Sequence, residues 1–227
     1  MATSGTKTFD PNSTEIAEEA YERIGTELRT GYNIETARRS MNFLLAEWAN
    51  EGINLWTVAE NSITLTESDA TETLSASLID ITSAVLRRDS TDIAIERVSR
   101  EEWLNIPNKS EESRPTQWYL DRQVTPILNL WPTPENSTDI FKYFGTFRLD
   151  DVTGPLQNIQ IPFRFLEAFT AGLAARLCIK ASVNSQEMMM RIPILSADYE
   201  LKLRMAKEED RDKSSFIVRP DLSGYSV

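Results

Sequence analysis

The spacing of apolar residues changes twice along this chain, and that change limits the folds it can adopt. Near the N-terminus apolar residues recur every three or four positions, which indicates helices. From Ile53 onward they alternate with polar residues, which indicates strands, and after Pro162 the helical spacing returns. We therefore predict an α+β fold, in which a helical bundle built from N- and C-terminal helices carries a central antiparallel β-rich insertion.

The same pattern divides the chain into segments. With 227 residues, it can bury roughly 70% or more of the surface that it exposes when unfolded, which is enough for a core without disulfides. We expect a flexible arm at residues 1–12, a helical bundle domain at 13–52 and 160–211, a β-rich domain at 53–159 and an extended C-terminal tail at 212–227.

Capping residues mark the expected helix ends. Asn12 followed by Glu15 predicts a capping box, and Gly25 is placed to end the first helix. A second helix is expected from a cap at Asn33 to Gly52. Seven large apolar residues at helical spacing form the predicted helical core: Met41, Leu44, Trp48, Leu166, Phe169, Leu173 and Leu177.

The C-terminal helices show two further features. Small residues interrupt the first of them, and they would let another helix approach closely: Ala168, Gly172, Ala175 and Ala181. In the second, Pro193 should kink the helix or start it afresh. Its expected inner stripe is Met188, Ile192, Leu195, Tyr199, Leu203 and Ala206.

Turn residues organise the middle of the chain. We expect a pair of strands around Glu60-Asn61, an acidic loop at 67–73, and a hairpin whose turn is Asp89-Ser90. Ser99 with Glu102 predicts the cap of a short helix, and residues 107–116 read as a polar connection. Further strands are expected at 118–120, at 127–131 up to Pro132 and Pro134, and at 140–149 with a bulge at Gly145.

Composition excludes several classes of protein. The 35 acidic and 24 basic residues give a formal charge of −11, which disfavours a broad DNA-binding face. No stretch approaches the roughly 18 to 20 apolar residues of a membrane span, and the N-terminus lacks a signal-peptide core, so we expect no membrane partner. The single Cys178 cannot form an internal disulfide, in agreement with cytoplasm-like conditions.

Residue types also restrict the chemistry. The chain has no histidine, which rules out Ser-His-Asp and Cys-His machinery and histidine-based zinc sites. Neither a G-x-x-x-x-G-K-[ST] nor a G-x-G-x-x-G segment occurs. Cys178 lies among apolar residues at helical spacing, so we interpret it as a buried packing thiol. We expect no catalytic residue, no metal and no cofactor.

Three groups of carboxylates remain as candidates for acid-base chemistry: Glu18-Glu19, Asp150-Asp151, and Asp80 with Asp89 and Asp92. Solvated faces and turns are the better explanation of them. The run Met188-Met189-Met190 fits either a malleable contact surface or core gap-filling, and Trp48 and Trp56 fit the lid of a core better than a ligand platform.

The end of the chain reads as a docking segment. Apolar residues are spaced there among polar ones, following an acidic helix end, and cannot bury much by themselves. Docking on a neighbouring chain and folding back onto its own subunit both remain open. The residues that would dock are Phe216, Ile217, Val218, Leu222 and Tyr225.

Four segments, in their order, resemble the head-to-tail adaptor family of short-tailed phages, also called tail tubular protein A or packaged-DNA stabilisation protein. The resemblance covers about residues 13–210. The first segment contains Asn33, Ala37 and Leu44-Leu45-Ala46-Glu47-Trp48, and continues through Gly52 to Leu55-Trp56. The second is Leu128-Asn129-Leu130-Trp131-Pro132-Thr133-Pro134. The third is residues 165–181 with Gly172-Leu173-Ala174-Ala175-Arg176-Leu177, and the fourth contains Tyr199, Leu203 and Ala206-Lys207.

The resemblance implies a structural virion protein. Such a protein forms a twelve-subunit ring between the portal protein and the tail nozzle protein, extends the DNA channel and helps retain packaged DNA. Double-stranded DNA would pass through the lumen without specific binding. It also implies that the tail from Ser214 to Val227 contacts the portal, and that the protein is located in the virion tail after assembly in the host cytoplasm.

Two alternatives stay open at this point. One is a virion-associated cell-wall hydrolase that uses a carboxylate pair, and the other is a different tail ring protein of the same particle.

Overall fold

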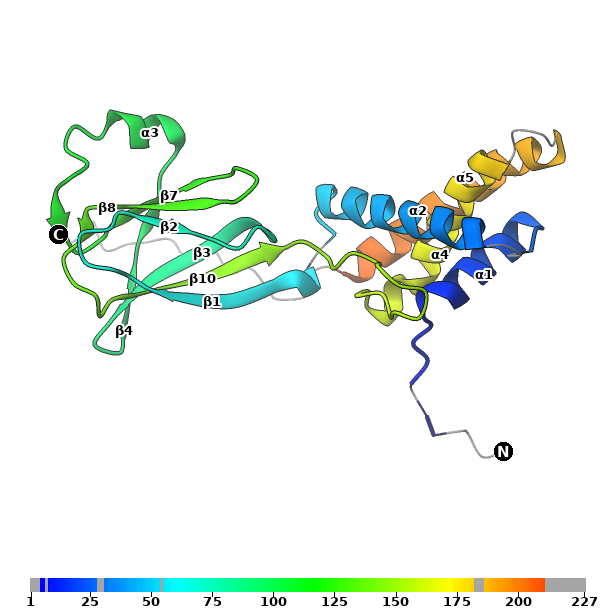
Figure 1. Cartoon of the computed structure of the whole chain (residues 1–227), viewed down its shortest axis with the longest axis horizontal. Coiled ribbons are helices and arrows are strands. Elements are labelled where there is room, and N and C mark those ends of the chain that lie inside the picture. The colour runs from blue at the N-terminus through cyan, green and yellow to red at the C-terminus, as the bar shows by residue number, and fades with distance from the viewer. Residues whose placement is uncertain (1–4, 7, 28–30, 54, 182–185, 211–227) are drawn as a thin grey trace, which may run out of the picture.

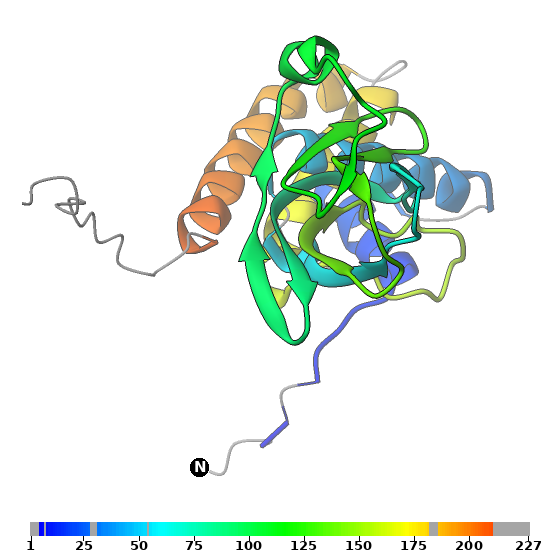
Figure 2. The same cartoon turned by 90° about the vertical axis from the view of Figure 1, so that its left-hand side faces the viewer.

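The computed structural model describes residues 5–6, 8–27, 31–53, 55–181 and 186–210. Two lobes lie end to end (Figure 1): a helical lobe, residues 12–53 and 148–210, and a β lobe, residues 58–147. Viewed along the long axis, the β lobe stands in front of the helices and the N-terminal arm extends away from both (Figure 2). The predicted α+β fold, with helices from both ends of the chain flanking a β-rich centre, is confirmed.

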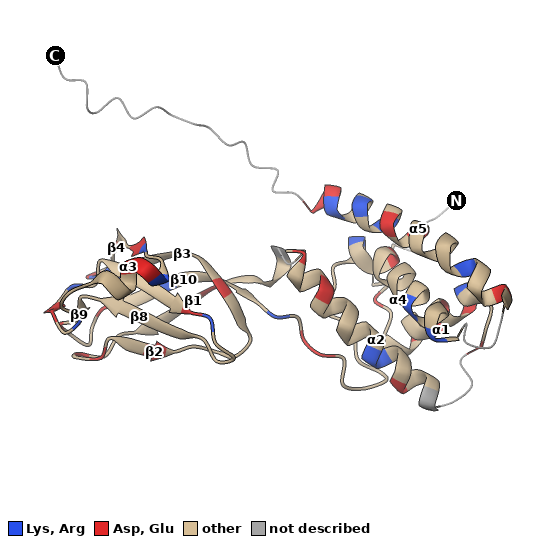
Figure 3. Cartoon of the chain, turned by 90° about the horizontal axis from the view of Figure 1, so that it is seen from above, with Lys and Arg blue, Asp and Glu red and all other residues tan. Residues whose placement is uncertain are grey.

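Four helices build the helical lobe: α1 (Ser13–Ile24), α2 (Gly31–Asn50), α4 (Leu166–Ala181) and α5 (Gln186–Glu209). Helix α4 contacts the other three, and seen from above it lies between α2 and α5 (Figure 3). Nearly all its residues from Leu166 to Cys178 are buried, so α4 forms the centre of the lobe.

The helix ends follow local signals, with one exception. The Asn12 side chain accepts from the backbone N–H groups of Thr14 and Glu15, and the Asn12 N–H donates to Glu15 at 2.9 Å, so the capping box is confirmed. Gly25 and Gly52 end α1 and α2 with φ of +86° and +75°, a region that favours glycine.

The predicted cap at Asn33 is wrong, because α2 already begins at Gly31. Asparagine costs only about 0.7 kcal/mol inside a helix, which the additional helical residues can offset. Helix α5 runs through Pro193 without ending or restarting, so the missing hydrogen bond does not stop a helix that packs along α4.

Close packing of α4 against α5 depends on a residue without a side chain. A Cβ placed on Gly172 would lie 2.7 Å from Cε2 of Tyr199 and 3.1 Å from Cδ2 of Leu44. The Tyr199 hydroxyl accepts from the indole N–H of Trp48 at 3.0 Å. Gly172 therefore lets α5 seat its tyrosine between α4 and α2, as expected for the small residues of α4.

Two four-stranded sheets face one another in the β lobe. The first has the order β1 (Val58–Thr64), β10 (Ile140–Phe147), β3 (Leu78–Arg88), β4 (Thr91–Ala94). The second has the order β2 (Thr71–Thr73), β8 (Ile127–Trp131), β7 (Gln117–Asp121), β5 (Glu96–Arg97). Trp118 and Phe141 meet between the sheets with ring centroids 6.0 Å apart. The buried residues between them all come from positions 65–143.

Most strand predictions are confirmed. Asp89 and Ser90, with φ of +48° and +66°, form the turn of the β3–β4 hairpin. The pairing of β10 with β3 shifts register between Phe144 and Gly145, as the bulge prediction requires. Ser99 and Glu102 form a capping box at the start of α3 (Arg100–Asn105).

Four strand predictions are wrong. β1 is one strand and passes straight through Glu60-Asn61, because it pairs along its whole length with β10. Thr71–Thr73 in the expected acidic loop form β2. β6 (Glu112–Ser113), in the expected polar connection, pairs with β9 (Thr133–Pro134), whereas β8 ends at Trp131 as predicted. β10 ends at Phe147, and Leu149 packs in the helical lobe instead.

A buried ion pair fixes the β3–β10 region. The Asp139 side chain has no exposed surface and accepts from Nε and Nη2 of Arg88 at 2.8 and 2.6 Å. Arg88 also reaches Glu135 at 2.8 Å, and its hydrogen bonds, above all those to Asp139, raise its pKa. Arg87 makes an equivalent bidentate contact with Asp92 on the surface, at 2.6 and 2.7 Å.

We predict that Gly172→Ala lowers the free energy of unfolding by about 1–2 kcal/mol, because overpacking against the Tyr199 ring outweighs the gain in helix propensity. Denaturant unfolding measures this. Gly154→Ala is the control, since the nearest atom to its added Cβ would be 3.5 Å away. A Gly172→Ala variant as stable as the parent would show that the helices can move apart at no cost.

We predict that Asp139→Asn lowers the free energy of unfolding by about 2–4 kcal/mol, because it leaves Arg88 without its buried partner while Glu135 remains. Asp92→Asn removes the equivalent contact from Arg87 at the surface, where solvent weakens it, and should leave the unfolding midpoint nearly unchanged. Equal losses in the two variants would refute the role given to burial.

The division into separate domains remains a prediction. Because the β-lobe cluster uses no residue of the helical lobe, we expect a fragment of residues 57–148 to fold alone. Cooperative thermal unfolding followed by tryptophan fluorescence tests this, and a fragment without a transition would contradict it.

Candidate functional site

The residues singled out from the sequence fall into two sets. The five tail residues proposed to dock lie outside the described part of the chain. The seven predicted core residues all lie in one buried cluster of the helical lobe, together with residues of α1 and α5. They therefore hold the helices of this lobe together.

The candidate carboxylates do not converge on one site. Asp80 lies near the start of β3 and Asp89 just beyond its end, and nine residues of strand span roughly 30 Å. Asp80 pairs with Arg97 at 2.8 Å, Asp151 with Arg148 at 2.7 Å, and Glu19 with Arg23 at 2.8 Å. The Arg87 guanidinium beside Asp92 lowers the pKa of that carboxyl.

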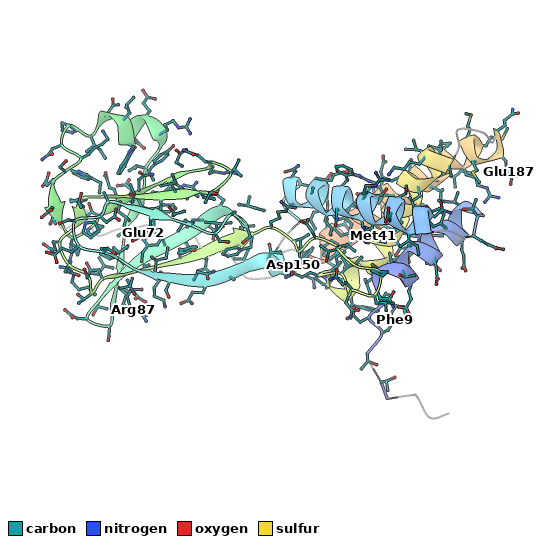
Figure 4. The ribbon with its side chains drawn as sticks, viewed as in Figure 1. Phe9, Met41, Glu72, Arg87, Asp150 and Glu187 are labelled. Atoms are coloured by element: carbon teal, nitrogen blue, oxygen red, sulfur yellow. The ribbon has the colours of Figure 1, made fainter. Side chains whose placement is uncertain are left out.

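The other notable acids are also apart. Glu72 of β2 lies in the β lobe, Asp150 at the junction of the lobes and Glu187 at the far tip of the helices (Figure 4). Burial, and then the nearby charge of Asp69, raise the pKa of the Glu72 carboxyl. Within the described residues no group of three histidines, cysteines or carboxylates is placed to hold a metal ion. The described acids thus stabilise surfaces and form no recognisable acid-base pair.

Cys178 has the packing role expected of it. Its side chain is fully buried, its Sγ lies 3.3 Å from the carbonyl oxygen of Met188, and burial raises the pKa of the thiol. A thiol whose ionisation is suppressed is a poor nucleophile.

The tryptophans and methionines divide between core and surface. Trp48 is buried against Phe165 and Phe169, and Trp56 is half-buried with its indole N–H on the carbonyl of Gln160 at 3.0 Å. Of the three consecutive methionines, Met188 packs on the helical core, while Met189 and Met190 are exposed. Met188 therefore fills the core, and a contact surface at Met189 and Met190 stays a prediction.

Helix α5 has apolar residues on two faces. One face packs against α4 through residues such as Tyr199, Leu203 and Ala206. The opposite face carries large apolar side chains four or seven residues apart, which places them on one side of the helix. These are Met190 (64% exposed), Ile194 (69%), Leu201 (46%) and Met205 (62%), and we call them the α5 outer stripe.

A groove lies where α2, α4 and the start of α5 meet. Its apolar lining includes Phe43, Leu177, Ala181 and Met188, and its polar lining includes Arg39, Lys180 and one carboxylate, Glu27. Phe43 is 66% exposed. Burial, then Arg39 and Arg176, lower the pKa of Lys180, whose amino group donates to Ser40 at 2.6 Å. We call this the α2/α4 groove.

Neither surface was identified from the sequence. The spacing of residues 190, 194, 201 and 205 is visible there, but so is the inner stripe of the same helix, and spacing alone does not say which one faces α4. The groove draws on residues up to 167 positions apart, from Tyr21 to Met188. No local pattern signals it.

Acidic and basic residues are interspersed over both lobes, as Figure 3 shows. Among the described residues, no helix combines the length and the apolar character needed to span a membrane. The molecule thus offers mixed surfaces at two separate lobes, together with two exposed apolar features on the helical lobe.

Comparison with known proteins adds the family. The family model described as SU10 adaptor protein matches residues 16–219, which spans both lobes. No curated protein matches the chain. Since the match covers most of the sequence, this chain belongs to the SU10 adaptor protein family, a family of phage head-tail adaptors.

Proposed function

We propose that this protein is a head-to-tail adaptor of a short-tailed phage: a structural virion protein that forms a ring between the portal and the tail nozzle. In that place it extends the DNA channel and helps retain packaged DNA. The observation that carries the proposal is the family match over residues 16–219. As the sequence resemblance implies, the ring has twelve copies.

The shape of the molecule supports such a position. Its two lobes lie end to end and have separate hydrophobic clusters, so each can present a surface to a different neighbour (Figure 1). An adaptor requires two such surfaces, one for the head side and one for the tail side. A formal charge of −11 also suits a channel through which DNA slides, because like charges repel.

The proposed role is structural and not enzymatic. A carboxylate-dependent hydrolase would need two acids close together in different environments. The candidate pairs of the described chain are instead dispersed, and several are held by arginines. No observation favours the hydrolase over the adaptor.

For the C-terminal tail we propose contact with the portal through Phe216, Ile217, Val218, Leu222 and Tyr225. Spaced apolar side chains of this kind can add to a partner as a strand or insert into it.

Deleting residues 214–227 should leave the protein folded but prevent its capture by purified portal, because it removes those side chains. Circular dichroism and a pull-down measure the two effects. A matched control keeps the length and replaces the five apolar residues by serine, and it should behave like the deletion. Undiminished capture of both variants would refute portal docking by the tail, and lost helicity would assign the tail to the core.

Electron microscopy of the full-length chain mixed with portal tests the whole proposal. Rings seated on one end of the portal are expected. Full-length protein that does not bind portal, but does bind purified nozzle or fibre protein, would favour another ring of the same tail.

A further inference from the structure

The α5 outer stripe is the feature that the isolated chain leaves unexplained. Helix α5 has apolar residues on two opposite faces with charged residues between them, and an apolar face of a helix is normally buried against another element. The inner face of α5 is satisfied by α4, whereas Met190, Ile194, Leu201 and Met205 are roughly half or more exposed. Between Ile194 and Leu201 the charged residue Asp198 lies beside this stripe, and it is paired with Lys202 at 2.8 Å. Contiguous exposed apolar surface of this kind marks an interaction site.

A second surface of the same lobe has a matching character. The α2/α4 groove has an apolar lining and an exposed Phe43, with Arg39 and Lys180 at its side. Met188, the groove residue from α5, lies on the inner face of that helix, so the groove and the outer stripe lie on different sides of α5. One copy can therefore present the stripe to the groove of a second copy while its own groove stays open.

Charge favours this pairing over stripe against stripe. The stripe is accompanied by exposed Glu200 and Glu208 and by the exposed cation Arg204. Two further cations beside it are already paired with carboxylates, Arg191 with Glu187 and Lys202 with Asp198. The groove has two cations in its lining, Arg39 and Lys180, against one carboxylate, Glu27. Two stripes face to face would instead bring their glutamates together.

We propose that the α5 outer stripe of one copy docks into the α2/α4 groove of the next copy, so that copies of this chain join head to tail through their helical lobes. Such a contact uses two different surfaces, and repetition of it closes a ring when the rotation between copies allows. This contact would specify how the copies of the proposed adaptor form their ring. It rests on the proposed function, which supplies the particle in which the ring forms.

Cross-linking between copies tests the contact. In a background with Cys178→Ala, one preparation carries Ile194→Cys and another carries Phe43→Cys, and the two are mixed with a short bis-maleimide, alone at high concentration and with portal. A mixed dimer between the two variants is expected. Val124→Cys, on the exposed β7–β8 turn, replaces either partner as a control and should cross-link at least about tenfold less.

The double variant Ile194→Glu and Leu201→Glu gives an independent readout. It should lower the association constant between copies by at least about tenfold, because docking would bury unpaired carboxylates. Thermal unfolding should be unchanged, since both side chains face solvent in the single chain. A variant with Val124→Glu should assemble like the parent.

Different outcomes separate the inference from the function. Cross-links only between two Ile194→Cys copies, yields equal to the control, or undiminished assembly of the glutamate variant would overturn the head-to-tail contact while leaving an adaptor role intact. A glutamate variant that assembles like the parent but is no longer captured by portal would also overturn the contact, and would identify the portal as the partner of the stripe. Cross-links as expected in a chain that does not bind portal would keep the contact and refute the proposed function.

Discussion

Burial of α4 is the constraint on which the rest of the structure depends. From Leu166 to Cys178 this helix has almost no exposed residue, and it is covered by α1 and α2 from the start of the chain and α5 from its end. The helical lobe can therefore close only after the chain has passed through the β lobe and returned. Antiparallel pairing of β1 with β10 places the exit and the return side by side. Behind that pair, Asn42 and Val152 exchange two hydrogen bonds, at 2.8 and 3.3 Å, which fastens the returning segment to α2.

Local signals predicted those parts of the fold that local energies decide. The capping boxes at Asn12 and Ser99 each join residues three positions apart, and both were predicted. The bulge at Gly145 was predicted from the glycine alone, although it forms against β3. β2 and β6 were not predicted, because two- and three-residue strands exist only through their partners β8 and β9. The buried Asp139 shows the same limit: it follows the polar residues 136–138, and its partner Arg88 is 51 residues away.

The candidate surfaces were harder to predict for a related reason. Both stripes of α5 are present in the sequence, and only packing on α4 decides that Tyr199 is inside and Ile194 outside. The groove around Phe43 has no periodic signal, since it arises where the ends of several helices meet. An apolar face that packs in the core and an apolar face that binds a partner have the same residue spacing. The sequence pattern alone therefore does not distinguish them, and the packing of the core does.

The strength of the proposed contact explains why it need not join copies in dilute solution. Fully burying one large apolar side chain contributes about 1.5–3 kcal/mol, so completing the burial of four that are already partly covered contributes about 4–8 kcal/mol. Association costs about 4–15 kcal/mol in lost freedom of motion. One stripe in one groove is thus close to balance for a free pair. A template that already holds the copies side by side removes most of that cost, and in a closed ring every copy makes the contact twice, once with its stripe and once with its groove. A contact near balance would therefore confine ring formation to the surface that seats the ring.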